Sequence, residues 1–107
     1  MPQNLDKDGL RSKINSYELF FIDIWGVIHN GLQIFEDSIE VLENLKKNNK
    51  EFVLLTNAPR PNSTVIDFLK KMGLKKFYED VYTSGEASLK YLMENFLNLK
   101  FYHIGPP

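Results

Sequence analysis

Blocks of apolar and polar residues along the chain predict strands and helices in turn. Two continuous apolar runs, at residues 19–24 and 51–56, are typical of strands buried on both faces. Shorter runs at residues 80–84 and 100–105 predict a third and a fourth strand. The runs are mainly apolar rather than alternating, as expected of a parallel sheet and not of strands with one face in water.

Between these runs, apolar residues recur at the three- and four-residue spacing of helices. A short helix is predicted over residues 10–17, and three longer helices follow. We expect their apolar positions to face the core. These are Ile39, Leu42 and Leu45; Val65, Ile66, Leu69 and Met72; and Leu89, Leu92, Met93 and Phe96. The alternation of strand and helix predicts a Rossmann-like α/β fold with helices on both faces of the sheet.

Three of the predicted helices carry residues that favour a defined end. Asp37 is expected to cap the first of the longer helices, with Glu40 completing a capping box. Gly73, in a left-handed conformation, is expected to end the second. Ser84 is expected to cap the third.

Composition excludes several classes of protein. The chain has 107 residues, a formal net charge of −1 and 43% hydrophobic residues, which indicates one ordinary globular domain. Binders of nucleic acids or membrane surfaces need a basic excess that this chain lacks. Without cysteine it has no disulfide, thiolate nucleophile or cysteine metal site. The polar N-terminus and the lack of a long apolar run predict a cytoplasmic protein.

Candidate chemistry lies where the predicted strands end, because ligands of parallel α/β sheets collect at the carboxyl ends of the strands. Asp23 lies at the end of the first strand, Thr56 and Asn57 at the end of the second, and Thr83 and Ser84 at the end of the third. A carboxylate there can act as a nucleophile or as a magnesium ligand. A hydroxyl at the start of a helix suits a phosphate. Each residue also has a plain structural interpretation as a cap, a turn residue or a strand end.

Three motifs together resemble one enzyme family. DIWGVIHNG (23–31), LLTNAPRP (54–61) and YTSGEA (82–87) are similar to the haloacid dehalogenase superfamily, in its class IIA or NagD-like phosphatase branch. Within that branch the chain resembles a subgroup with Trp two residues after the Asp. The resemblance implies a magnesium-dependent phosphohydrolase that acts on a small phosphorylated metabolite such as a sugar phosphate.

The resemblance also implies a role for each matching position. Asp23 matches the nucleophile that becomes a transient aspartyl phosphate. The Asp23 carboxylate and the backbone carbonyl of Trp25 would hold Mg²⁺. The Thr56 hydroxyl and the Asn57 amide would bind the phosphoryl oxygens. Residues 26–31 would form a mobile flap beside the nucleophile.

Trp25 departs from the family pattern, which has a second Asp at this position to protonate the leaving oxygen. An indole cannot do this, because its N–H only donates hydrogen bonds. We interpret Trp25 instead as an anchor beneath a cap domain. His29 either replaces the missing acid and base or is a plain loop residue. Arg60 either contacts a phosphate or lies at the surface of a turn.

The resemblance further implies that residues 1–107 form the N-terminal part of a single longer core domain. A later lysine, a later acidic pair and the substrate-selecting cap domain would lie beyond Pro107. We therefore expect the chain alone to hydrolyse no phosphomonoester measurably and to self-associate through an uncovered sheet edge. The alternative is a non-catalytic remnant or interaction module of the same fold. A receiver-like regulator is a third hypothesis, but its acidic cluster and its lysine after the last strand are missing.

Overall fold

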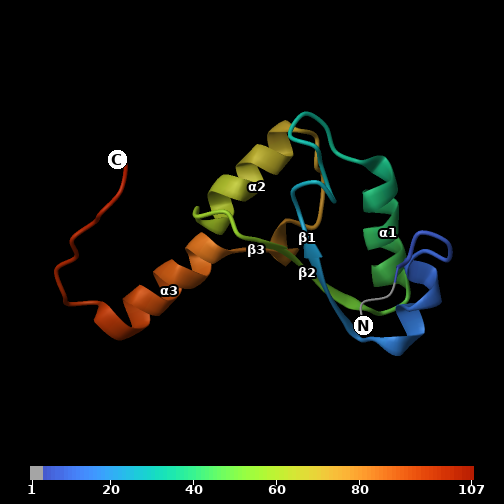
Figure 1. The fold of residues 1–107 in the computed structure, drawn as a ribbon, viewed down its shortest axis with the longest axis horizontal. Helices are drawn as coiled ribbons and strands as arrows, with labels where there is room; N and C mark the ends of the chain where they lie inside the picture. The colour runs from blue at the N-terminus through green and yellow to red at the C-terminus, as the bar shows by residue number, and fades with distance from the viewer. Residues whose placement is uncertain (1–3) are drawn as a thin grey trace.

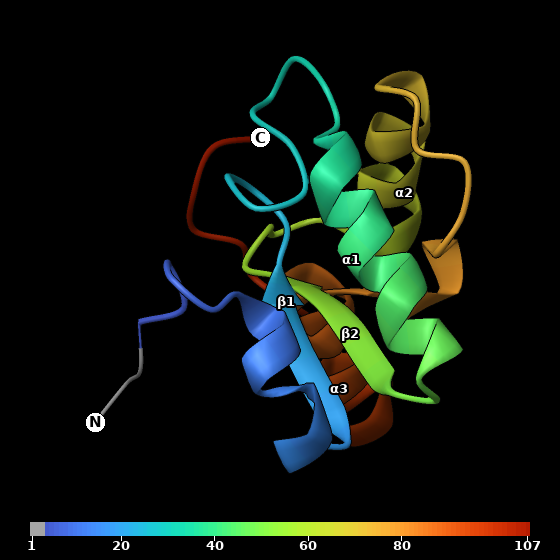
Figure 2. The same cartoon turned by 90° about the vertical axis from the view of Figure 1, so that its right-hand side faces the viewer.

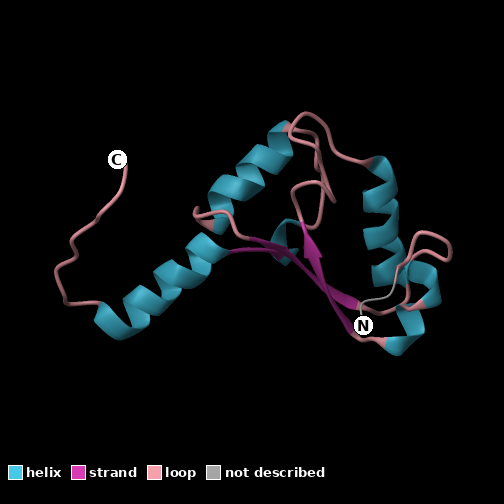
Figure 3. Cartoon of the chain, viewed as in Figure 1, coloured by secondary structure: helices cyan, strands magenta, loops and turns pink. Residues whose placement is uncertain are grey.

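A parallel sheet of three strands forms the centre of the molecule (Figures 1 and 3). The computed structural model describes residues 4–107, so the first three residues of the polar N-terminus lie outside the described residues. The strands lie side by side in chain order and are β1 (Leu19–Asp23), β2 (Glu51–Thr56) and β3 (Val81–Thr83). Each agrees with its predicted run to within one residue at either end. The predicted α/β fold with a parallel sheet is confirmed.

Helices and short 3₁₀ turns make up the rest of the regular structure. The helices are α1 (Glu36–Lys47), α2 (Asn62–Lys71) and α3 (Ser84–Phe96), and the turns are η1 (Leu10–Ser12), η2 (Ile14–Ser16) and η3 (Tyr78–Asp80). The short helix predicted over residues 10–17 is therefore a pair of 3₁₀ turns, although Leu10 and Ile14 still pack against the core. None of the helices in the described part of the chain is long and apolar enough to cross a membrane.

Helices α1 and α2 cover one face of the sheet (Figure 2). On that face the side chains of Phe52, Leu54 and Val81 are at most 3% exposed. Burying an apolar side chain of this size stabilises a fold by roughly 1.5–3 kcal/mol. The core that forms here consists of Ile24, Ile28, Leu42, Leu45, Phe52, Leu54, Leu69, Leu74 and Val81.

The opposite face of the sheet is open among the described residues. Its apolar side chains include Phe21, Leu55 and Tyr82, which are 69%, 42% and 37% exposed. Helix α3 starts beside this face and then points away from the sheet, so it does not cover it (Figure 1). The radius of gyration is accordingly 16.5 Å, against about 13 Å for a compact chain of this length. The predicted helical cover is thus complete on one face only.

Helix α3 and the residues after it differ most from the prediction. The apolar stripe of Leu89, Leu92, Met93 and Phe96 was expected in the core but is 37–52% exposed. The fourth strand predicted over residues 100–105 is irregular, and its side chains are exposed. A strand forms only where a neighbouring strand satisfies its backbone hydrogen bonds, and this segment pairs with none in the described structure.

The start of α1 also corrects a prediction. Asp37 and Glu40 do not form a capping box, because α1 begins at Glu36 and no side chain caps it. Phe35 occupies the cap position, and its N–H donates to the Ile28 carbonyl at 2.8 Å. A contact with a preceding loop therefore sets where the helix begins. The acidic side chains of Glu36 and Asp37 lie in the first turn, where they interact favourably with the helix dipole.

The end of α2 agrees with the prediction. Gly73 has a φ of +107°, and its N–H donates to the Lys70 carbonyl at 3.0 Å. The Leu74 N–H donates to the Leu69 carbonyl at 3.0 Å, and the Leu74 side chain is buried. These two bonds satisfy carbonyls that the helix end leaves open.

Candidate active site

The carboxyl ends of the three strands meet at one cleft. Asp23 pairs with Leu55, and Thr56 pairs with Thr83, so the strand ends are level with one another. The cleft has a volume of about 590 Å³. Its polar lining is Asp23, Thr56, Asn57, Thr83 and Ser84, and its apolar lining is Phe21, Leu55, Tyr82 and Ala87. The predicted meeting of the strand-end residues is confirmed, whereas their chemical roles stay predictions.

Asp23 is the carboxylate of this cleft. Its side chain is exposed at the end of β1, and its Oδ1 accepts a hydrogen bond from the Ile24 N–H at 2.8 Å. Ile24 is buried in the core, so this bond ties the carboxylate to a fixed part of the main chain. The position combines accessibility to a solute with a defined orientation, which a nucleophile requires.

Thr56 and Asn57 follow β2 on the next strand. The half-buried Thr56 accepts a hydrogen bond at Oγ1 from the Ala58 N–H at 3.3 Å. A hydroxyl that accepts a hydrogen bond still has its own O–H to donate. Asn57 is exposed beside it and contributes an amide to the cleft. Both residues thus bring donors to the edge at which Asp23 lies.

His29 is buried and does not line this cleft. It is 4% exposed, and its ring meets Trp25 and Phe68 edge-on, with centroids 5.1 Å and 5.7 Å away. Its Nδ1 accepts a hydrogen bond from the Gly31 N–H at 2.8 Å. Burial lowers the pKa of His29, which depletes the protonated form that a general acid needs. The acid and base role of His29 stays a prediction, and this environment does not favour it.

The loop of residues 26–31 is folded around Trp25. The indole lies against Gly31, where a Cβ atom would be only 2.5 Å from the ring carbon Cζ3. Gly31 also has a φ of +89°, a conformation that L side chains rarely adopt. The Gly26 N–H donates to the His29 carbonyl at 2.8 Å. Trp25 therefore packs on its own loop, while its side chain remains largely exposed.

The described residues bring few metal ligands together. No group of three or more His, Cys, Asp or Glu side chains that could hold a metal ion occurs within residues 4–107. The Asp23 carboxylate and the Trp25 carbonyl are two residues apart and are oxygen ligands, as Mg²⁺ prefers. Because Mg²⁺ commonly retains several waters and binds phosphate oxygens, this donor set fits the ion.

The junction of β3 and α3 contains site residues whose contacts the sequence did not reveal. Ser84 was expected to cap α3, but Thr83 is the cap, and its Oγ1 accepts from the Glu86 N–H at 2.9 Å. Ser84 Oγ instead donates to the Asn57 carbonyl at 2.9 Å. Two hydroxyls followed by a glycine at a strand end are the only sequence signal of this arrangement.

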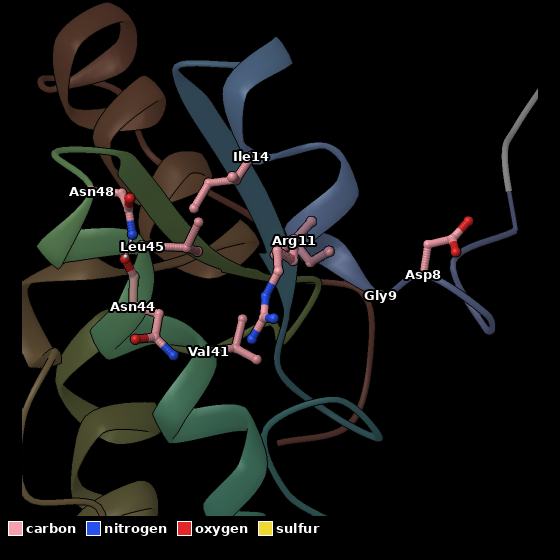
Figure 4. A pocket seen from close by; sticks show the side chains of 9 residues that line it. Asp8, Gly9, Arg11, Ile14, Val41, Asn44, Leu45 and Asn48 are labelled. Carbon is pink, nitrogen blue, oxygen red and sulfur yellow. Dashed lines mark hydrogen bonds between the residues drawn. The ribbon is translucent and has the colours of Figure 1, made fainter.

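A further cavity lies between the N-terminal turns and α1 (Figure 4). Its volume is about 540 Å³, and its lining includes Ile14, Arg11, Asn44 and Asn48. The side chain of Arg11 reaches toward α1, near Val41. None of the site residues predicted from the sequence lines this cavity.

Comparisons with known proteins identify relatives. The family model described as haloacid dehalogenase-like hydrolase matches residues 20–107. A haloacid dehalogenase-like hydrolase structure from Brucella suis 1330 is 30% identical over 89% of this chain and 35% of its own, with a TM-score of 0.69. The 4-nitrophenylphosphatase of Thermotoga maritima is 31% identical over 78% of this chain and 32% of its own, with a TM-score of 0.66.

A third structure, described as a putative nagD protein, is 32% identical over 74% of this chain and 32% of its own, with a TM-score of 0.63. The chain thus spans about a third of the length of these three proteins. A search of curated proteins found no match.

Proposed function

The chain belongs to the haloacid dehalogenase-like hydrolase family, and on this premise we propose that it carries the nucleophile of a magnesium-dependent phosphohydrolase. The substrate proposed is a small phosphorylated metabolite, such as a sugar phosphate. The observation that carries this proposal is that Asp23, Thr56 and Asn57 line the same cleft. A matched structure named as a 4-nitrophenylphosphatase supports phosphate-ester chemistry.

The proposed reaction has two steps. A carboxylate oxygen of Asp23 attacks phosphorus, the bond from phosphorus to the leaving oxygen breaks, and an aspartyl phosphate forms. Water then attacks this phosphorus, which releases inorganic phosphate and restores the carboxylate. The Thr56 hydroxyl and the Asn57 amide orient the phosphoryl oxygens and balance their negative charge. Mg²⁺, held by the Asp23 carboxylate and the Trp25 carbonyl, would supply further positive charge.

The rate of the proposed reaction is expected to depend on the leaving group, because Trp25 stands where the family pattern has an acid. An indole cannot give a proton to an alkoxide, and assistance from a general acid is typically worth about 10²–10⁴-fold. Aryl and acyl phosphates leave as stable anions and need no such proton. An acyl phosphate is therefore the sharpest probe of the Asp23 nucleophile.

The test is phosphorylation of the chain by acetyl phosphate with Mg²⁺, followed by intact-mass spectrometry. We expect one added phosphoryl group, labile to hydroxylamine and absent without Mg²⁺. Asp23→Asn should abolish it, because an amide is a poor nucleophile. Asp67→Asn, at an exposed carboxylate on α2, should leave it unchanged. Labelling that persists in Asp23→Asn would show that the nucleophile is elsewhere.

As a second candidate we propose an interaction module that self-associates. The open face of the sheet favours it, since Phe21, Leu55 and Tyr82 expose apolar surface there. Within the described residues, β1 pairs on one side only, with β2, so its other edge is unpaired. Exposed apolar faces and unpaired edges both promote association between chains.

A further inference from the structure

The loop of residues 57–61, which follows Thr56, is held by the junction between β3 and α3. Thr83 is fully buried, although its side chain is polar. Its Oγ1 donates to the Arg60 carbonyl at 2.5 Å and accepts from the Glu86 N–H. The hydroxyl therefore joins the loop to the first turn of α3 through one atom.

The neighbours of Thr83 add further hydrogen bonds to the same loop and to the start of α2. Ser84 Oγ donates to the Asn57 carbonyl at 2.9 Å and lies 3.1 Å from the Ala58 carbonyl oxygen. The Gly85 N–H donates to the Ala58 carbonyl at 3.1 Å. The Glu86 carboxylate accepts from the N–H of Asn62, the first residue of α2, at 3.0 Å. Both ends of the loop are thus tied to one short segment.

Gly85 is required by the close approach of the two segments. A Cβ atom built on Gly85 would lie 2.5 Å from the carbonyl oxygen and 2.6 Å from the carbonyl carbon of Arg60. These are backbone atoms, which cannot rotate away as a side chain would. Any residue other than glycine here would push the loop outward.

The hydrogen bonds also decide which groups the loop can present to the cleft. They bind the carbonyl oxygens of Asn57, Ala58 and Arg60 to the junction. A carbonyl oxygen carries partial negative charge, so one that faced a phosphate would repel it. Fixing three carbonyls elsewhere favours the hydroxyl and amide donors of Thr56 and Asn57 at the cleft.

We propose that residues 83–86 are a clasp that positions the phosphate contacts of Thr56 and Asn57. Thr83 and Ser84 act by hydrogen bonding to the loop, and Gly85 acts by allowing its close approach. They are positioning residues, because they act through the loop. This inference rests on the proposed function, since it assigns phosphate to Thr56 and Asn57. Donor groups must be held within about 0.5 Å of the productive geometry to act, which an exposed loop achieves only if it is fixed from outside.

The experiment compares backbone amide NMR spectra of the 107-residue chain, first free and then titrated with inorganic phosphate and Mg²⁺. Thr83→Val keeps the shape of the side chain but removes the hydroxyl, and Thr83→Ser keeps the hydroxyl. Ser84→Ala removes a contact at an exposed position, so the fold should tolerate it. Thr64→Val, at an exposed threonine on α2, is the matched control.

In the free chain, Thr83→Val and Ser84→Ala should shift the amide signals of Asn57, Ala58 and Arg60, the loop residues that carry an N–H, while Thr83→Ser and Thr64→Val should not. Thr83→Val should also weaken phosphate binding by about tenfold, the effect of one or two lost hydrogen bonds. Unshifted loop signals in Ser84→Ala would overturn the clasp, as would equal shifts in Thr83→Ser and Thr83→Val. If the original chain binds no phosphate, the phosphate site of the proposed function fails, and the free spectra still decide whether the clasp fixes the loop.

Discussion

The two faces of the sheet have similar apolar character but very different burial. On the face toward α1 and α2, Leu54 is fully buried. On the other face, its neighbour Leu55 is 42% exposed and Phe21 is 69% exposed. Side chains of successive strand residues point to opposite faces. Helices α1 and α2 cover only the face of Leu54. The continuous apolar runs specify two covering layers, of which residues 4–107 supply one.

The largest expected effect is a difference in the free energy of unfolding between substitutions on the two faces of the sheet. Leu54→Ala should lower the free energy of unfolding by about 2–5 kcal/mol, because it leaves a cavity in the core. Leu55→Ala on the same strand should cost less than about 1 kcal/mol, because the side chain already contacts solvent. Chemical denaturation followed by circular dichroism measures both. Equal losses would show that the second face is also buried in solution.

The next effect tests whether the open face causes association. Phe21→Lys should weaken self-association by roughly ten- to a hundredfold, since burying a phenylalanine is worth about 1.5–3 kcal/mol. Tyr102→Lys, at a side chain that is 91% exposed in the C-terminal segment, is the control and should leave association unchanged. Sedimentation velocity over a concentration series gives the dissociation constants. A chain that stays monomeric at every concentration would contradict the proposal of a self-associating interaction module.

The smallest effect concerns His29, which packs between Trp25 and Phe68 of α2. Burial lowers its pKa in the folded chain below the ordinary value of 6.5. The unfolded chain therefore takes up the proton first as the pH falls through about 6.5, and the folded state loses stability. The stability gained by keeping His29 neutral is fully present above pH 6.5. It is lost as the pH falls toward the lowered pKa of the folded state.

Thermal unfolding at pH 5 and pH 7 measures this dependence. His29→Gln should reduce the drop in melting temperature between the two values. His103→Gln, at the other histidine and in the exposed C-terminal segment, should keep the drop as in the original chain. Identical drops in all three proteins would mean that His29 is accessible to protons in the folded state.

The candidate site divides into a part that the sequence predicted and a part that it did not. Asp23 and Thr56 end apolar runs, and parallel strands must bring such ends to one edge, so their meeting followed from local pattern. The contact of Thr83 with the Arg60 carbonyl joins residues 23 positions apart. No local pattern encodes such a contact, and Ser84 accordingly looked like a simple cap.

The sequence by itself determined the three strands, the parallel sheet and the glycine end of α2, because side-chain periodicity and backbone conformation are properties of short segments. Tertiary structure alone decided the start of α1, the exposure of the α3 stripe and the irregular path of residues 100–105. An apolar stripe on a helix stabilises the fold only where it packs against another apolar surface. A strand forms only beside another strand. Burial and strand pairing are therefore properties of neighbours in space, which the order of residues along a short segment does not contain.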